Sequence, residues 1–85
     1  MYNIEYSKDV ESDISKLPKK DILKILLKIE KLAEDPRPAG IEPLQGKFKG
    51  LHRIRSGDYR IVYQIIDDRL IVLIVRVAHR GEVYK

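Results

Sequence analysis

The sequence contains no cysteine, and this absence excludes several kinds of site. Disulfide bonds, zinc sites with thiolate ligands and a cysteine nucleophile are all impossible, and such a chain suits a reducing compartment. Long apolar runs are absent too, because the longest, Leu70 to Val75, is far shorter than the ~20 residues of a membrane-spanning helix. The N-terminus also lacks the basic start and apolar stretch of an export signal. We therefore expect a soluble, cytoplasmic protein with no membrane contact.

Metal ligands are scarce as well. The two histidines, His52 and His79, lie far apart in the sequence, and neither has a carboxylate at ligand spacing. Asp67 and Asp68 form a pair, but their position between two apolar runs is typical of a turn. The sequence therefore predicts neither a metal site nor a cofactor.

Positive charge is concentrated in the second half of the chain. Residues 1–46 contain eight Lys or Arg against nine Asp or Glu, whereas residues 47–85 contain nine against four. Six of the seven arginines lie in that second half. Because the planar guanidinium group binds phosphate with a fixed fork of donors, this pattern indicates an acidic partner, either nucleic acid or an acidic protein segment.

The first half of the chain predicts a strand and two helices. Residues 2–6 alternate apolar and polar side chains, as in a half-buried strand. Ser7 is placed to cap a first helix that ends before Pro18, and residues 19–34 show the apolar periodicity of a second helix. A proline- and glycine-containing loop then runs from Asp35 to about Gly50.

The second half predicts three antiparallel strands, at about 51–56, 59–66 and 69–77. No repeat or linker divides the chain, so residues 1–85 form a single domain. The fold class is therefore α+β, in which two N-terminal helices pack on one face of a small antiparallel sheet, in the order β-α-α-β-β-β.

Arginines gather on one face of the predicted hairpin. If Gly57 and Asp58 form its two-residue turn, Arg55 faces Arg60 across the strands, and Arg53 lies on the same face. Like charges opposite each other destabilise a sheet, so three guanidinium groups together suggest that a polyanion binds there. A solvated basic strand face is the alternative.

Two lysines precede this hairpin in the loop. Lys47 and Lys49 are not part of a glycine-rich phosphate cradle, because no helix follows them. We expect them either to steer a substrate electrostatically or to form an ordinary solvated surface.

The last predicted strand is apolar on both sides. Alternation places Leu70 under the helices and Val77 on the arginine side, together with other apolar residues. Either a partner or the chain's own C-terminus is expected to cover that side. Continued alternation also places His79 on the arginine side and His52 on the helix side.

These residues resemble the RelE toxins of the RelE/ParE superfamily. The shared elements are Arg53-Ile54-Arg55, Gly57-Asp58-Tyr59-Arg60, His79-Arg80 and Val83-Tyr84, in family order and spacing, with the lead-in from Leu44 to Gly50. The resemblance covers essentially the whole chain. It implies the same fold that the pattern of strands and helices predicts.

The resemblance also implies a function. RelE-type toxins belong to type II toxin–antitoxin systems, are neutralised by a RelB-like antitoxin, and cleave mRNA in the A site of the ribosome. The substrate's own 2′-hydroxyl attacks the phosphate and leaves a 2′,3′-cyclic phosphate, which requires no metal. The alternatives are a ParE-like toxin, which inhibits DNA gyrase by binding, and a degenerate member that retains only antitoxin binding.

The resemblance also implies a role for individual residues of this chain, position by position. Arg60 and Arg80 are implied to hold the scissile phosphate and to stabilise developing charge. Tyr84 is implied to stack on a base or to transfer a proton, with an aromatic anchor on the sheet as the alternative. Arg53 and Arg55 match positions that are often lysine, and since arginine is a poor proton shuttle we expect them to orient phosphate only. His79 is expected either to transfer a proton or to bind phosphate.

Overall fold

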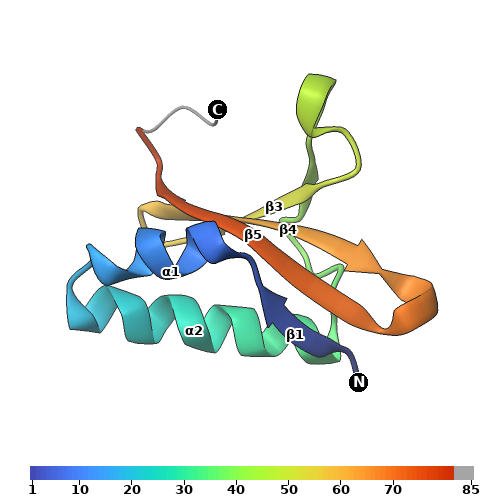
Figure 1. Cartoon of the computed structure of the whole chain (residues 1–85), viewed down its shortest axis with the longest axis horizontal. Helices are drawn as coiled ribbons and strands as arrows, with labels where there is room; N and C mark the ends of the chain where they lie inside the picture. The colour runs from blue at the N-terminus through green and yellow to red at the C-terminus, as the bar shows by residue number, and fades with distance from the viewer. Residues whose placement is uncertain (82–85) are drawn as a thin grey trace.

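One five-stranded sheet carries both helices on the same face in the computed structural model, which describes residues 1–81 (Figure 1). The elements are, in order, β1 (Asn3–Tyr6), α1 (Lys8–Ser15), α2 (Lys19–Glu34), β2 (Glu42–Pro43), the 3-10 helix η1 (Gly46–Phe48), β3 (His52–Ser56), β4 (Tyr59–Ile66), the 3-10 helix η2 (Asp67–Arg69) and β5 (Ile71–His79). The strand order across the sheet is β1-β5-β4-β3-β2, with β1 parallel to β5 and the other neighbours antiparallel. The predicted fold is confirmed, and β1 and the short β2 extend the predicted meander into a mixed sheet.

Helix α2 forms over the residues that the apolar periodicity predicts. Pro18 occupies its N-cap position, and Pro36 prevents the helix from continuing past its end. The side chains that face the sheet are Ile25, Ile29 and Leu32, each at most 1% exposed. Their spacing of three to four residues puts one continuous apolar stripe of α2 against the core.

Helix α1 is tied to the edge of β5 by two polar contacts. Ser7 is the N-cap residue, but its Oγ donates a hydrogen bond to the carbonyl of Val75 (2.7 Å) and does not cap the helix. Asp13 Oδ2 accepts a hydrogen bond from the backbone N–H of Val77 (2.9 Å). Because β1 pairs with β5 only as far as Ile74, Asp13 satisfies an edge donor that no strand reaches.

The β3–β4 hairpin has the predicted turn and register. Gly57 has a φ of +59°, a conformation that suits glycine at the first position of a tight hairpin turn. Ser56 pairs with Tyr59, and Arg55 pairs with Arg60. The next pair in the ladder, Ile54 and Ile61, is buried in the core under the helices. Alternation therefore places the arginine pair on the opposite side of the sheet.

A β-bulge in β5 changes the predicted alternation. Between consecutive residues of β4, the pairing partner in β5 steps from Arg76 to Ile74, so Val75 is an extra residue. Beyond it, Val77 lies in the core at 4% exposure. The prediction that Val77 lies on the arginine side is wrong, because simple alternation does not anticipate an inserted residue.

The turn between β4 and β5 is longer than a two-residue Asp67-Asp68 turn. It contains the 3-10 helix η2 and ends at Leu70, whose φ of +54° is left-handed. Leu70 is 49% exposed, and β5 begins only at Ile71. The predicted inward position of Leu70 is therefore wrong, because this residue completes the turn.

A polar cluster joins the N-terminus, the loop after α2 and the β4–β5 turn. Asp67 accepts hydrogen bonds from the hydroxyl of Tyr2 (2.6 Å) and from Nη1 and Nη2 of Arg37 (3.1 and 2.8 Å). These contacts, the hydrogen bond from Arg37 first among them, lower the pKa of Asp67 to about 2. Three segments far apart in the sequence are thus connected through one carboxylate.

A buried hydrogen bond lies under the same loop. The hydroxyl of Tyr63 donates to the carbonyl oxygen of Pro36 at 2.9 Å, and Tyr63 is fully buried. Burial raises the pKa of Tyr63 to about 12. The bond holds the loop after α2 against the sheet.

Acid is expected to weaken the fold through Asp67. Its pKa is about 2 in the folded protein, against ~3.9 for an unfolded aspartate. The stabilisation is therefore complete above about pH 4 and is lost as the pH falls through about 2. In Asp67→Asn, the thermal midpoint should depend less on pH in this window than in the wild type, as measured by circular dichroism. Asp68→Asn is the control, because it removes a neighbouring exposed carboxylate that makes no ion pair in residues 1–81. Its thermal midpoint should depend on pH as in the wild type. If both variants reduce the pH dependence equally, the effect does not come from Asp67.

Removing the Tyr63 hydroxyl should destabilise the protein. Tyr63→Phe leaves the carbonyl of Pro36 without its buried donor, which costs about 1–3 kcal/mol in the free energy of unfolding. Urea denaturation should show a lower midpoint with an unchanged slope. Tyr2→Phe removes an exposed hydroxyl and serves as the control, with an expected loss smaller than that of Tyr63→Phe.

Candidate nucleic-acid interface

The side of the sheet away from the helices carries a group of arginines, which we call the arginine face. Arg53, Arg55 and Arg60 lie there as predicted, and Arg76 joins them from β5. Val62 is paired with Arg53 on one side and Arg76 on the other, and it is only 2% exposed. Long arginine stems can cover an apolar side chain while their charged ends stay in solvent.

Three arginines at this face already have carboxylate partners. The closest contacts are Arg53 Nη2 to Glu42 Oε2 (2.8 Å), Arg76 Nε to Asp13 Oδ2 (3.0 Å) and Arg80 Nη1 to Asp58 Oδ1 (3.8 Å). Arg76 also donates through Nη2 to the second oxygen of Asp13 at 3.0 Å. The two closer contacts hold the guanidinium groups of Arg53 and Arg76, whereas the exposed pair of Arg80 and Asp58 is looser.

Arg55 and Arg60 differ from the other three. They stand directly opposite each other in the hairpin, and within residues 1–81 neither makes a hydrogen bond or an ion pair through its side chain. Two like charges held opposite each other cost free energy, and an anion between them removes that cost. This pair is therefore the place on the arginine face that is best suited to a phosphate group.

Glu42 brings a carboxylate to the same group of arginines. Its pKa is lowered, first by the hydrogen bond from Arg53 and the charge of Arg53, and further by the charges of Arg55 and Arg60. The carboxyl group is thus ionised at neutral pH and lies within electrostatic reach of the predicted phosphate site. Sequence reasoning missed Glu42, because a two-residue strand shows neither length nor alternation.

Lys47 and Lys49 lie in the loop that projects from the sheet on the side away from the helices (Figure 1). Both side chains are exposed, and Lys47 Nζ lies 5.4 Å from the centroid of the Phe48 ring. Their position near the arginine face fits a steering role for a polyanion.

His79 is not where alternation predicts it. It pairs with Tyr59, and the two rings meet edge to face with centroids 5.6 Å apart. Since Tyr59 packs against the core under the helices, His79 lies on the helix side, and its predicted position on the arginine face is wrong. The bulge at Val75 is the cause, because it reverses the alternation of every later residue in β5. His52 lies on the helix side, opposite Tyr63, as predicted.

Arg80 extends the arginine face at the end of β5. Its backbone N–H donates to the carbonyl of Asp58 at 2.7 Å, and its side chain is 69% exposed. Arg80 therefore stands beside the hairpin turn, next to the Arg55–Arg60 pair. Tyr84 lies outside the described residues, and its role remains a prediction.

The apolar residues of the arginine face are mostly covered. Val62, Ile71 and Ala78 are at most 6% exposed, and Leu73 and Val75 are half-buried. No partner is needed to bury the first three. Gln64, which pairs with Leu73, is exposed on this face beside the arginines.

Within residues 1–81, no three histidine, aspartate or glutamate side chains come together as metal ligands would. None of the helices in that part of the chain is long and apolar enough to cross a membrane.

Comparison with known proteins identifies the relatives of this chain. The family model described as the ParE toxin of the type II toxin–antitoxin system parDE matches residues 4–84. The protein named toxin RelE of Mycobacterium tuberculosis is 32% identical over 85 residues, which cover 99% of this chain and 87% of the relative. Toxin RelG of the same organism is 29% identical, with 99% and 97% covered. The crystal structure of the RelBE2 toxin–antitoxin complex of that organism contains a chain with a TM-score of 0.84 and 29% identity, covering 93% of this chain and 98% of its own length.

Arg55 and Arg60 should dominate the binding of a polyanion. We expect Arg55→Ala and Arg60→Ala each to weaken the binding of an uncleavable 2′-O-methyl RNA, and to reduce the slope of log affinity against log salt by about 0.7 per arginine. Fluorescence anisotropy at several salt concentrations measures both quantities. Arg69→Ala removes an exposed arginine at the far end of β4 and should leave the slope unchanged; a loss equal to that of Arg60→Ala would refute a localised site.

Proposed function

The chain belongs to the ParE toxin family of type II toxin–antitoxin systems, and from this premise we propose that it is a RelE-like endoribonuclease that cleaves mRNA on the ribosome. The relatives named RelE and RelG favour this activity within the family. The observation that carries the proposal is the facing pair Arg55 and Arg60, whose side chains make no hydrogen bond or ion pair within residues 1–81 and whose charges help to lower the pKa of the nearby Glu42.

The proposed reaction needs a proton acceptor, which we assign to Glu42. Glu42 removes the proton of the substrate's 2′-hydroxyl, and the 2′-oxygen then attacks the adjacent phosphorus. Its lowered pKa keeps the carboxyl group ionised and so ready to accept, although it also makes Glu42 a weaker base than a free carboxylate. The bond from phosphorus to the 5′-oxygen breaks, and the departing oxygen takes a proton from Tyr84 or from water. The products are a 2′,3′-cyclic phosphate and a 5′-hydroxyl end.

The arginines stabilise the negative charge that develops on the phosphate. Arg55 and Arg60 lie on both sides of the proposed position, and Arg80 approaches from the end of β5. Guanidinium groups fixed before the reaction stabilise a transition state without reorganisation. Arg53 positions Glu42 through its 2.8 Å contact, while Lys47 and Lys49 attract the RNA from the adjoining loop. Tyr84 is proposed as a stacking or proton-transferring group, whereas His79, which lies on the helix side against Tyr59, is not part of the proposed site.

The proposed partners are a RelB-like antitoxin, the ribosome and its mRNA. The relative of known structure was crystallised as a toxin–antitoxin complex, which supports an antitoxin for this chain. An antitoxin segment with acidic side chains would be complementary to the arginine face and would exclude RNA from it.

Inhibition of DNA gyrase is the second candidate function, because the matching family model is described by the name ParE. This function would require binding without nuclease chemistry. It makes no use of the carboxylate of Glu42 that is paired with Arg53 at the edge of the arginine face, which is why we rank it second.

Expression of the chain in cells without antitoxin should produce new mRNA 5′ ends in translated regions, phased to codons. Glu42→Gln should lower the cleavage rate about 10²–10⁴-fold and Arg60→Ala about 10²–10³-fold, while Arg69→Ala cleaves normally. Sequencing of RNA 5′ ends measures the cuts, and plasmid supercoiling is assayed in the same cultures. Growth arrest with intact mRNA and altered supercoiling would transfer the assignment to gyrase inhibition.

A further inference from the structure

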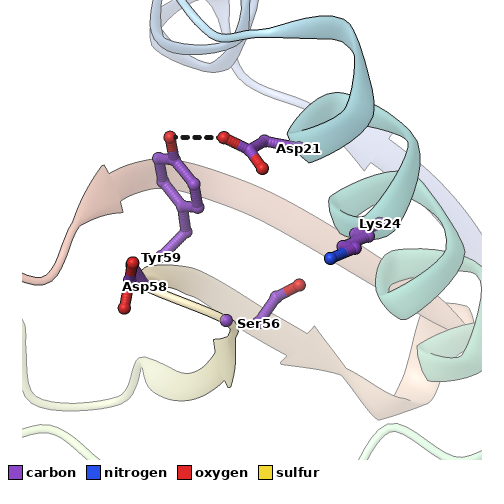
Figure 2. A pocket seen from close by; sticks show the side chains of 6 residues that line it. Asp21, Lys24, Ser56, Asp58 and Tyr59 are labelled. Carbon is purple, nitrogen blue, oxygen red and sulfur yellow. Dashed lines mark hydrogen bonds between the residues drawn. The ribbon is translucent and has the colours of Figure 1, made fainter.

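A small polar hollow lies behind the phosphate site, on the helix side of the hairpin tip. It measures about 190 Å³ and is lined by Asp21, Lys24, Ser56, Gly57, Asp58 and Tyr59. Figure 2 shows Asp21 and Lys24 reaching from α2 toward Ser56 and Tyr59 of the hairpin. This volume is below the ~300–1,000 Å³ typical of sites for drug-sized ligands, so it suits a single planar group.

Donors and acceptors are both available in the hollow. The hydroxyl of Tyr59 donates to Asp21 Oδ2 at 3.0 Å, which holds the carboxylate in place. Within residues 1–81, Asp21 Oδ1, Lys24 Nζ and Ser56 Oγ make no hydrogen bond or ion pair. Two carboxylates and one ammonium line the space, and one of the carboxylates, Asp58, already faces Arg80 at 3.8 Å. The opposite charges of Asp21 and Lys24 remain, and they disfavour a phosphate and suit a neutral group that both donates and accepts hydrogen bonds.

The register of the hairpin relates this hollow to the phosphate site. The pair Ser56–Tyr59 stands next to the pair Arg55–Arg60, and alternation directs the two pairs to opposite sides of the sheet. The two sites are therefore back to back at the hairpin tip. Around the tip of the hairpin, the two sites are separated only by Gly57 and Asp58. Gly57 has no side chain that could block the path between the sites.

We propose that this hollow binds an unstacked RNA base next to the cleaved phosphate, and that the base is guanine. The proposal rests on the function proposed above. Guanine presents two adjacent N–H groups, which suit the carboxylate of Asp21, beside a carbonyl oxygen, which suits Lys24 or Ser56. Single-stranded RNA is commonly recognised through the Watson–Crick edges of bases that are turned out of the stack. The hollow thus gives the proposed nuclease a sequence preference of its own.

The test uses short 2′-O-methyl oligouridylates, each with a single guanosine at a different position, and the same set with inosine. Inosine lacks only the exocyclic amino group. For at least one position, the wild-type chain should bind the guanosine form about tenfold more tightly than the inosine form. Asp21→Asn should abolish this difference, and Lys24→Ala should weaken binding of both forms at the same position.

Tyr59→Phe is the matched control. It removes the hydrogen bond between Tyr59 and Asp21 but keeps the carboxylate, so it should retain the preference for guanosine. Equal binding of the two forms by the wild type, or a preference that persists in Asp21→Asn, would overturn the proposal. Loss of antitoxin binding in Asp21→Asn with unchanged RNA preference would also overturn it, by assigning the hollow to a basic side chain of a protein partner.

Failure of this proposal and failure of the proposed function give different results. If Arg60→Ala abolishes binding while guanosine and inosine forms bind equally, the phosphate site stands and the base site does not. If Arg60→Ala binds RNA as tightly as the wild type, the phosphate site is wrong and the proposed function with it, whatever the oligonucleotide series shows.

Discussion

The pairing of Ser56 with Tyr59 across the Gly57 turn determines the direction of every side chain in β3 and β4. Ile54 and Ile61 are directed into the core by this register, and the arginines are directed away from it. Burial of each large apolar side chain contributes about 1.5–3 kcal/mol, whereas like charges across a strand pair cost about 0.2–1 kcal/mol. The core therefore holds the arginines together against their own repulsion. A slip of one residue would expose the isoleucines and bury guanidinium groups.

Carboxylates give the arginine face its internal organisation. Arg53, Arg76 and Arg80 are each placed by an acidic side chain from another part of the fold. Among the arginines of this face, and within the described residues, only Arg55 and Arg60 have no such partner and are available to bind an external anion. An evenly charged face would attract RNA without orienting it, while a face in which most charges are paired directs the phosphate to one position. In the proposed function, specificity for one phosphate would therefore depend on the acidic residues as much as on the basic ones.

Local patterns in the sequence were sufficient for most of the fold. The apolar stripe of residues 19–34 and the Gly57-Asp58 turn each specify a structure through interactions between near neighbours, and both appear as predicted. The facing arginines follow directly from that turn. What could not be predicted depends on pairing between distant segments. Glu42 reaches Arg53 through a strand too short to recognise, and Asp13 reaches β5 across the space left where β1 ends.

The one-residue insertion at Val75 also makes the orientation of the end of β5 independent of the orientation of its beginning. Residues before it follow one alternation and residues after it follow the opposite one, so the terminal segment from Val77 to Arg80 is oriented separately from the strand that carries it. Loss of Val75 in a relative would turn His79 toward the arginines and Arg80 toward the helices without altering a single residue of the site. In this fold, a change in strand length is therefore a route to new site chemistry that a comparison of site residues alone would overlook.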